Sequence, residues 1–176
     1  MQKFNLLVTT YRHMESEAVT EINFLLAEVG DERPDVSYTG VSGLLTCRTN
    51  LDPLEAIERI KKIVQEDPWK VRYVLRLIPV DRVVNTDIQE IKETVKELAE
   101  RIGAGETFRI TVEKRRSGIH SADIIKEVAS LIDRKVSLEQ QDWLVLIEVV
   151  GRETGISVIR PDNIFSAVKV KRELPE

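Results

Sequence analysis

The 176-residue sequence has very little sulfur and few aromatic side chains. It contains one cysteine, Cys47, and two histidines, so an internal disulfide is impossible and there are too few soft ligands for a structural zinc site. Aromatic residues make up 5% of the chain, which limits base stacking as a means of holding nucleic acid. We therefore predict a protein of a reducing compartment with no metal and no cofactor.

Long apolar runs are also missing. No window approaches the roughly 18 uninterrupted apolar residues of a membrane-spanning helix, and residues 1–30 lack the basic start and apolar core of a signal peptide. These absences predict a cytoplasmic protein with no membrane partner. The formal net charge is −4, so a polyanion would have to bind through a local patch of Lys and Arg.

The first half of the chain alternates between strand-like and helix-like patterns. Asp52 and Pro53 form a helix start, and Ser16 precedes an earlier amphipathic stretch. Strands are expected over residues 4–10, 36–38, 44–48 and 73–80. The resulting order, βαββαβ, is that of the ferredoxin-like fold. We predict an α+β protein whose first domain covers residues 1–80.

The second half follows a different order. Thr86 is expected to cap a helix that Gly103 ends. A strand at 107–113, a helix from about 122 to 133 and strands at 136–138, 143–150 and 156–160 are expected next. The strand from Trp143 is apolar on both faces, which predicts a central position in the sheet. This αβαβββ order predicts a second domain at 81–170 packed on the first, with 171–176 as a C-terminal tail.

The junction between the strand at 107–113 and the following helix carries the clearest functional signal. Lys114, Arg115 and Arg116 follow the strand directly, and Ser121 stands at the start of the helix. The backbone N–H groups and dipole of a helix start attract phosphate. The junction is therefore predicted to bind an anion, against the alternative that three charged residues merely solvate a strand end.

A second basic cluster lies near the C-terminus. Arg160 ends the last expected strand, and Lys169 and Lys171 lie on an alternating segment that is expected to extend beside it. Two basic segments support RNA binding better than one does. The predicted RNA contacts are Lys114, Arg115, Arg116, Ser117, His120, Ser121, Arg160, Lys169 and Lys171.

Patterns typical of catalysis are missing. The glycines of Gly103-Ala104-Gly105 come between a helix and the strand after it, whereas a phosphate-binding loop leads from a strand into a helix. The glutamates at 90, 93, 97 and 100 interleave with Lys and Arg, as on a solvated helix face. Neither histidine has a second ligand at metal spacing. We predict no catalytic residues and a protein that is not an enzyme.

Residues 81–160 resemble the THUMP domain, a tRNA-binding module named for thiouridine synthases, methyltransferases and pseudouridine synthases. The resemblance lies in the order of elements and in four segments: Arg115–Ile125, Val136–Leu138, Asp142–Val149 and Gly155–Val158. The last segment, together with the preceding Leu146–Gly151, looks most like the short THUMP proteins that assist tRNA cytidine acetylation.

This resemblance implies a noncatalytic adaptor that grips the acceptor end of tRNA. Such an adaptor would present tRNA to an RNA acetyltransferase or another tRNA-modifying enzyme, with residues 114–121 as the best-matched RNA contacts. The rival hypothesis is a ferredoxin-like regulatory or scaffolding protein with no RNA affinity, in which the basic residues are only solvated.

Overall fold

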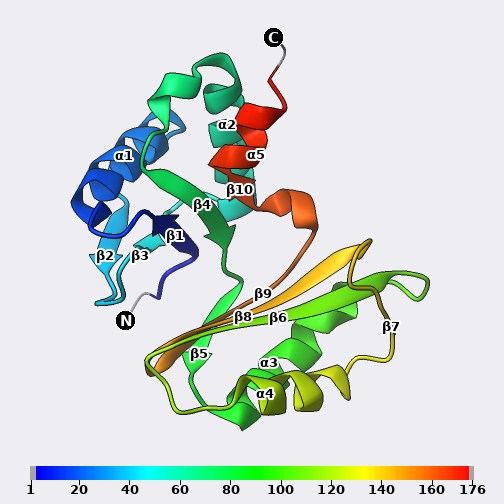
Figure 1. The fold of residues 1–176 in the computed structure, drawn as a ribbon. Helices are drawn as coiled ribbons and strands as arrows, with labels where there is room; N and C mark the ends of the chain where they lie inside the picture. Colours follow the sequence, from blue (N-terminus) through cyan, green and yellow to red (C-terminus); the bar gives the residue numbers. More distant parts are fainter. Residues whose placement is uncertain (1–2, 175–176) are drawn as a thin grey trace. The chain divides into compact units, whose positions relative to one another are not determined.

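The computed structural model describes residues 3–174 and divides into two compact units (Figure 1). The first unit combines the chain up to Pro79 with the segment from Asp162 onward, and the second runs from Val80 to Pro161. The predicted range of 81–170 for the second domain, and a separate tail at 171–176, are therefore corrected. The chain returns to the first unit after Pro161.

The first unit has the predicted βαββαβ order. Helices α1 and α2 cover one face of its sheet and form the core with β1, β3 and β4. The four strands pair antiparallel in the order β4-β1-β3-β2, which is the ferredoxin-like arrangement. The elements are β1 (Leu6–Thr10), α1 (Glu15–Glu28), β2 (Asp35–Tyr38), β3 (Leu44–Arg48), α2 (Pro53–Glu66), η1 (Pro68–Lys70) and β4 (Val74–Pro79).

The C-terminal segment completes this first unit. It comprises η3 (Pro161–Asn163), β10 (Phe165–Ser166) and α5 (Ala167–Arg172). The fully buried Phe165 pairs with Leu77 of β4, which adds β10 as an edge strand. The extended segment predicted for Lys169 and Lys171 was wrong. The Ser166 hydroxyl accepts a hydrogen bond from Lys169 N and caps a short helix that buries Ala167 and Val170.

The second unit has an α+β fold as predicted, with α3 and α4 on one face of a five-stranded sheet (Figure 1). The strand order is β5-β9-β8-β6-β7, so the predicted central position of β8 is confirmed. Its elements are β5 (Arg82–Asn85), α3 (Ile88–Leu98), η2 (Ala99–Arg101), β6 (Thr107–Arg115), α4 (Ser121–Ala129), β7 (Lys135–Val136), β8 (Trp143–Val150) and β9 (Glu153–Ile159).

The pairing of β6 with β8 is parallel and continues over the whole length of both strands. Its register runs from Phe108 opposite Trp143 to Arg115 opposite Val150. Strand β9 then returns antiparallel to β8 through a tight turn in which Gly151 has a φ of 60°. Gly151 N donates a hydrogen bond to Arg115 O at 2.8 Å. Strand β6 therefore includes Lys114 and Arg115, beyond the predicted end at residue 113.

One strand of the second unit was not predicted, and two local predictions were wrong. Strand β5, just after the start of this unit, pairs with β9. Helix α3 is capped by Asp87, which accepts from Glu90 N at 3.1 Å, while the Thr86 hydroxyl bonds the Thr154 hydroxyl at 2.8 Å. The helix ends at Leu98 and continues as η2, so Gly103 is not its C-cap.

The carboxylate of Glu21 on α1 ties this helix to the start of β4. It accepts backbone N–H bonds from Arg72 and Val74 at 2.6 Å and from Tyr73 at 3.0 Å. We expect Glu21→Ala to lower the free energy of unfolding by about 1 to 2 kcal/mol, because the N–H groups lose a charged acceptor. Urea denaturation measures the change, with the exposed Glu17→Ala on the same helix as control. Equal midpoints for the two variants would contradict this role.

Candidate nucleic-acid interface

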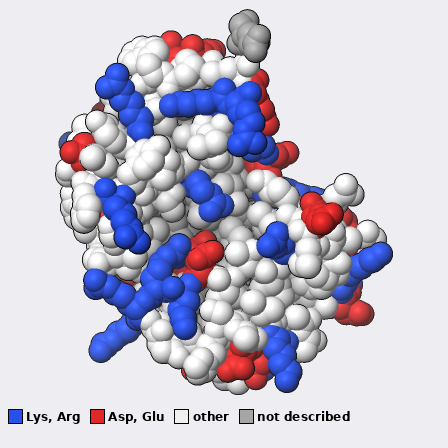
Figure 2. Space-filling view, in the orientation of Figure 1, with Lys and Arg blue, Asp and Glu red and all other residues white. Residues whose placement is uncertain are grey.

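Four cations come together where β6 ends and β8 turns into β9. Lys114 and Arg115 end β6, Arg116 follows in the left-handed region with a φ of 55°, and Arg152 lies in the β8–β9 turn. The bond from Gly151 N to Arg115 O brings that turn against the end of β6. We call Lys114, Arg115, Arg116 and Arg152 the basic end. Lys and Arg side chains gather at the lower left of Figure 2, where β6 finishes in Figure 1.

The four cations of the basic end are not equivalent. Arg115 Nη1 lies 2.6 Å from Glu148 Oε2 on β8, so its charge is already neutralised within the sheet. Lys114, Arg116 and Arg152 are exposed and form no ion pair with any residue from 3 to 174. These three side chains are therefore the ones free to neutralise phosphates.

The loop from Arg116 into α4 leaves the start of that helix open. Ser117 accepts a bond from Ile119 N at 3.3 Å, which shapes the loop. His120 is the N-cap residue, but no side chain caps the helix, and Ser121 is its first residue. The first backbone N–H groups of α4 remain available to an external acceptor, as the sequence predicts for an anion site.

A surface hollow of about 640 Å³ adjoins this helix start. It is bordered by Ser117 and His120 of the loop, by the beginning of α3, and by Asp123, Lys126 and Glu127 of α4. Its carboxylates outnumber its cations, so the hollow itself does not favour phosphate. It offers mixed donors and acceptors beside the basic end, a setting for a ribose or a base edge.

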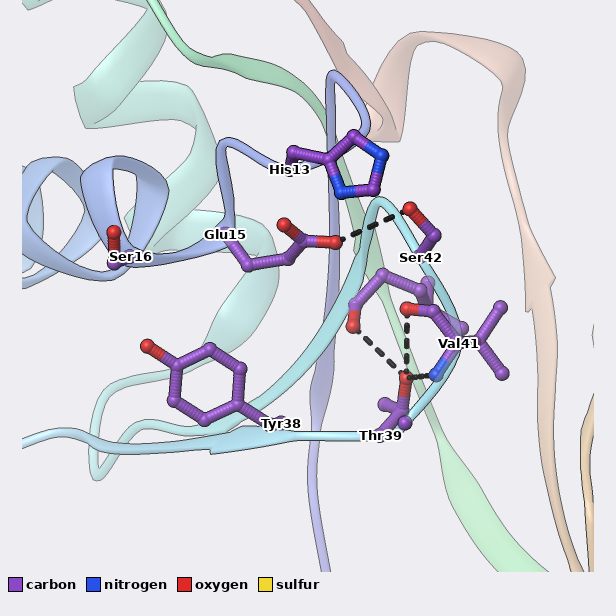
Figure 3. A pocket seen from close by; sticks show the side chains of 9 residues that line it. His13, Glu15, Ser16, Tyr38, Thr39, Val41 and Ser42 are labelled. Atoms are coloured by element: carbon purple, nitrogen blue, oxygen red, sulfur yellow. Dashed lines mark hydrogen bonds between the residues drawn. The ribbon is translucent and has the colours of Figure 1, made fainter.

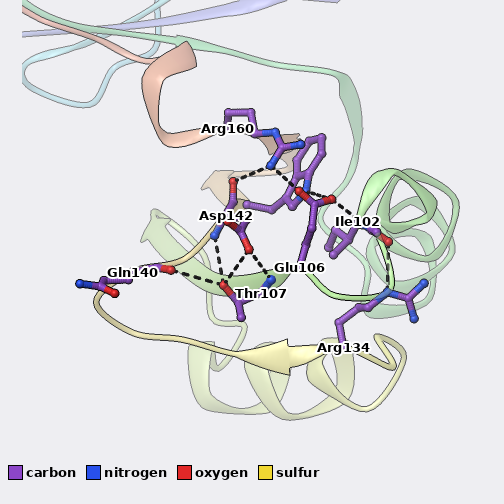
Figure 4. Close-up of polar contacts among 9 residues, drawn as sticks. Ile102, Glu106, Thr107, Arg134, Gln140, Asp142 and Arg160 are labelled. Carbon is purple, nitrogen blue, oxygen red and sulfur yellow. Dashed lines mark hydrogen bonds and ion pairs between the residues drawn. The ribbon is translucent and has the colours of Figure 1, made fainter.

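Arg160 lies at the other end of the sheet, next to Glu106 (Figure 4) and in contact with Trp143. Its guanidinium stacks over the Trp143 ring, with Cζ 4.0 Å from the centroid, and its Nη1 lies 2.6 Å from Glu106 Oε2. Trp143 Nε1 donates to Glu106 Oε1 at 3.0 Å. Trp143 begins β8, whose other end is roughly 23 Å away at 3.3 Å per residue. Arg160 is therefore remote from the basic end.

Further polar contacts hold the same end of the sheet. Thr107 N donates to Asp142 Oδ2 at 2.8 Å, and Arg134 Nε donates to Ile102 O at 3.1 Å (Figure 4). The first bond fixes the loop that leads into β8, and the second ties the segment before β7 to the end of η2. The cluster is thus a structural clamp on the central strand, and the guanidinium of Arg160 is one of its parts.

The remaining two predicted contacts, Lys169 and Lys171, belong to the first unit. Lys169 Nζ lies 3.4 Å from Asp162 Oδ1, and Lys171 Nζ donates to Val71 O at 2.7 Å. Both side chains hold α5 to neighbouring segments of that unit. Lys114 to Ser121 thus lie together between the end of β6 and the start of α4, Arg160 lies at the other end of the second unit's sheet, and Lys169 and Lys171 belong to the first unit.

Comparison with known proteins identifies the second unit. The family model of the THUMP domain matches residues 85–159. Residues 85–159 form a THUMP domain. The predicted resemblance is confirmed, and both β6 with its basic end and the open start of α4 lie within this domain. No curated protein matches the sequence.

Solved structures show the same fold over 90% of this chain. PH1313 from Pyrococcus horikoshii Ot3 matches with a TM-score of 0.68 at 18% identity, over 55% of its own length. TrmN from Thermus thermophilus matches with 0.58 at 16%, over 47% of its length. A 4-thiouridine synthetase–RNA complex with bound ATP matches with 0.57 at 16%, over 42% of its length. The chain thus spans about half the length of these proteins. These neighbours show the shared fold, and the THUMP domain points to a function related to tRNA binding or modification.

Sequence reasoning missed Arg152 and Lys126 as members of this surface. The sequence places Gly151 and Arg152 in a turn between two predicted strands. It does not show that β6 pairs parallel with β8, and this pairing is what brings Arg152 beside Arg116. No group of three or more His, Cys, Asp or Glu residues that could hold a metal ion occurs among residues 3–174. Within the same range, no helix is long and apolar enough to cross a bilayer.

The clamp around Glu106 makes the stability of the THUMP domain sensitive to acid. The Trp143 N–H, the Gly103 backbone N–H and then Arg160 lower the pKa of Glu106 from 4.5 to about 2. A lowered pKa means that the stabilisation is complete above pH 4.5 and is lost as the pH falls from 4.5 toward 2. We expect the Tm of Glu106→Gln to fall less over this pH range than the Tm of the wild-type chain. Melting curves of this variant and of the exposed control Glu100→Gln, at pH 6 and pH 3, test this. Identical pH dependence in both would refute it.

Proposed function

We propose that this chain is a noncatalytic tRNA-binding adaptor of the cytoplasm, which holds the acceptor end of tRNA for a modifying enzyme. The observation that carries the proposal is the group of three unpaired cations, Lys114, Arg116 and Arg152, beside the open start of α4 in a THUMP domain. Phosphate contacts of this kind position RNA without reading its sequence.

Charge at this surface is local, which fits the acidic character of the whole chain. The net charge is −4, so general attraction to a polyanion is weak and binding has to be directed to the basic end. The hollow beside Ser117 and His120 has the mixed polarity that suits a ribose or base edge next to a bound phosphate. The acceptor end, which is partly single-stranded, presents both.

The partner enzyme is the finer part of the proposal. The segments Leu146–Gly151 and Gly155–Val158 resemble short THUMP proteins that assist tRNA cytidine acetylation. We therefore propose an RNA acetyltransferase as the partner and N4-acetylcytidine as the product of the complex. A role without catalysis of its own belongs to this proposal, because no constellation typical of catalysis was found in the sequence.

The basic end predicts a specific salt dependence of tRNA binding. We expect Arg116→Ala with Arg152→Ala to flatten the plot of log affinity against log salt by about 0.7 to 0.9 per lost phosphate contact. Fluorescence anisotropy with full tRNA at several salt concentrations measures the slope. The matched control is Lys96→Ala with Lys135→Ala, which removes two exposed charges elsewhere in the second unit. If Arg116→Ala with Arg152→Ala leaves the slope of log affinity against log salt unchanged, the assignment of the basic end as the tRNA interface is refuted.

The acceptor end is tested with truncated RNA, and the partner is tested in cells. Removing the 3′ end of the tRNA should weaken binding to the wild-type chain and should matter less to the Arg116→Ala, Arg152→Ala variant.

In cells that lack this chain, tRNA N4-acetylcytidine should fall, and an acetyltransferase should co-purify with the tagged protein. Normal N4-acetylcytidine levels would refute the acetylation role and leave the tRNA-binding role standing.

A further inference from the structure

A second hollow, of about 510 Å³, lies in the first unit between the β1–α1 turn and the β2–β3 hairpin. Its volume is within the usual range for small-molecule sites, roughly 300 to 1,000 Å³. Figure 3 shows His13, Glu15, Tyr38 and Ser42 around the same space. None of these residues belongs to the THUMP domain or to the contacts predicted from the sequence.

The walls of this hollow are held in place by backbone geometry. Gly43 has a φ of 77°, and a Cβ atom there would meet Thr10 O at 2.8 Å, so only glycine lets the hairpin approach β1. The Thr39 hydroxyl accepts from Val41 N at 3.0 Å and donates to Leu44 O at 2.9 Å. The close approach of Gly43 to β1 and the hydrogen bonds of Thr39 therefore hold the hairpin in one position, and the wall of the hollow is preformed.

Glu15 supplies a carboxylate whose Oε2 accepts no hydrogen bond from a side chain among residues 3–174. Its Oε1 accepts from Gly43 N at 2.8 Å and from the Ser42 hydroxyl at 3.4 Å. The Gly43 bond is the main cause that lowers the pKa of Glu15, so the group stays ionised. Both of these bonds end on Oε1, and among residues 3–174 no side chain donates to Oε2. The backbone N–H of Glu15 itself also bonds the carboxylate and lowers its pKa. Oε2 can accept a hydrogen bond from a ligand.

Aromatic and basic groups border the same space. The Tyr38 ring is 63% exposed, in a chain where only 5% of residues are aromatic. His13 is held in the left-handed region with a φ of 67°, an uncommon conformation for a residue other than glycine. Arg12, the residue before His13, is exposed, but its side chain does not line the hollow.

We propose that this hollow binds one unpaired RNA base that carries an exocyclic amino group. The base stacks on Tyr38, and its amino group donates to Glu15 Oε2. Adenine, cytosine and guanine have such an amino group. Uracil has none, and its one edge donor, N3–H, is flanked by two carbonyl oxygens that the carboxylate repels, so uracil should bind more weakly. This inference rests on the proposed tRNA-binding function, to which it adds a base-selective contact outside the THUMP domain.

Free nucleotides test the chemistry of the hollow without tRNA. The full chain, labelled with ¹⁵N, is titrated with AMP, CMP, GMP and UMP while the amide signals of Ser42 and Gly43 are followed. We expect AMP, CMP or GMP to shift these signals at concentrations at least about fivefold below UMP, a difference of one hydrogen bond. Absence of any shift, or equal response to UMP, overturns the proposal.

Two substitutions sharpen this test. Glu15→Gln keeps an oxygen for Gly43 N and replaces the free oxygen with an amide donor, so the preference should move toward UMP. Tyr38→Ala should abolish the shifts, whereas Trp69→Ala should leave them unchanged. Trp69 is 67% exposed and lies in η1, next to Lys70, which pairs with Glu28 at the opposite end of α1 from Glu15. If Glu15→Gln binds the four nucleotides with the same order of affinity as the wild-type chain, the proposed role of the carboxylate is overturned.

Full tRNA separates this inference from the function on which it rests. Tyr38→Ala should weaken tRNA binding by about 5- to 100-fold, the usual effect of losing one stacked base, and Trp69→Ala should not. If the wild-type chain binds tRNA and Tyr38→Ala binds equally well, the hollow is not an RNA site and the proposed function stands. If the wild-type chain binds no tRNA, the proposed function fails, and the nucleotide titration alone decides the hollow.

Discussion

The parallel pairing of β6 with β8 is the constraint on which the candidate interface depends. Parallel neighbours cannot be joined by a tight turn, so the chain has to cross over between Arg115 and Trp143, and α4 lies in that crossover. The crossover begins at the carboxyl end of β6, where the cations lie. Ligands of open sheets with parallel strands bind at this end for the same geometric reason. The antiparallel return through Gly151 then adds Arg152 to the same edge.

The arginines of the second unit show that a charge count does not define a binding surface. Arg115 is paired with Glu148, and Arg160 is paired with Glu106 while it stacks on Trp143. The Arg115–Glu148 pair is largely buried and the Arg160–Glu106 pair is partly exposed. Both pairs fix a guanidinium in one geometry and reduce its availability to phosphate. Arg116 and Arg152 have no such carboxylate among residues 3–174. The partners of each cation, more than its position in the sequence, decide which ones can meet RNA.

Features encoded over a few consecutive residues were predictable. The βαββαβ order, the Asp52 cap with Pro53, and the central position of β8 follow from periodicity, capping chemistry and the apolar character of Trp143–Val150. Features that need a partner distant in sequence were not. Strand β5 exists because β9 pairs with it, and α5 forms where an alternating pattern had indicated a strand, because Ala167 and Val170 are buried on one helix face. The closeness of Arg152 to the basic end depends in the same way on strand pairing.

The scarcity of aromatic side chains makes their distribution informative. Phe108 and Phe165 are buried in the two cores, and Trp143 is engaged by Arg160 and Glu106. Tyr38 is exposed beside a carboxylate that is held by a glycine N–H. Phosphate contacts position a nucleic acid, whereas contacts to base edges select it. A chain of net negative charge gains little from nonspecific electrostatic attraction to RNA. A small cationic surface for the phosphate backbone, combined with a separate site for one base, would let this chain hold RNA with few aromatic side chains.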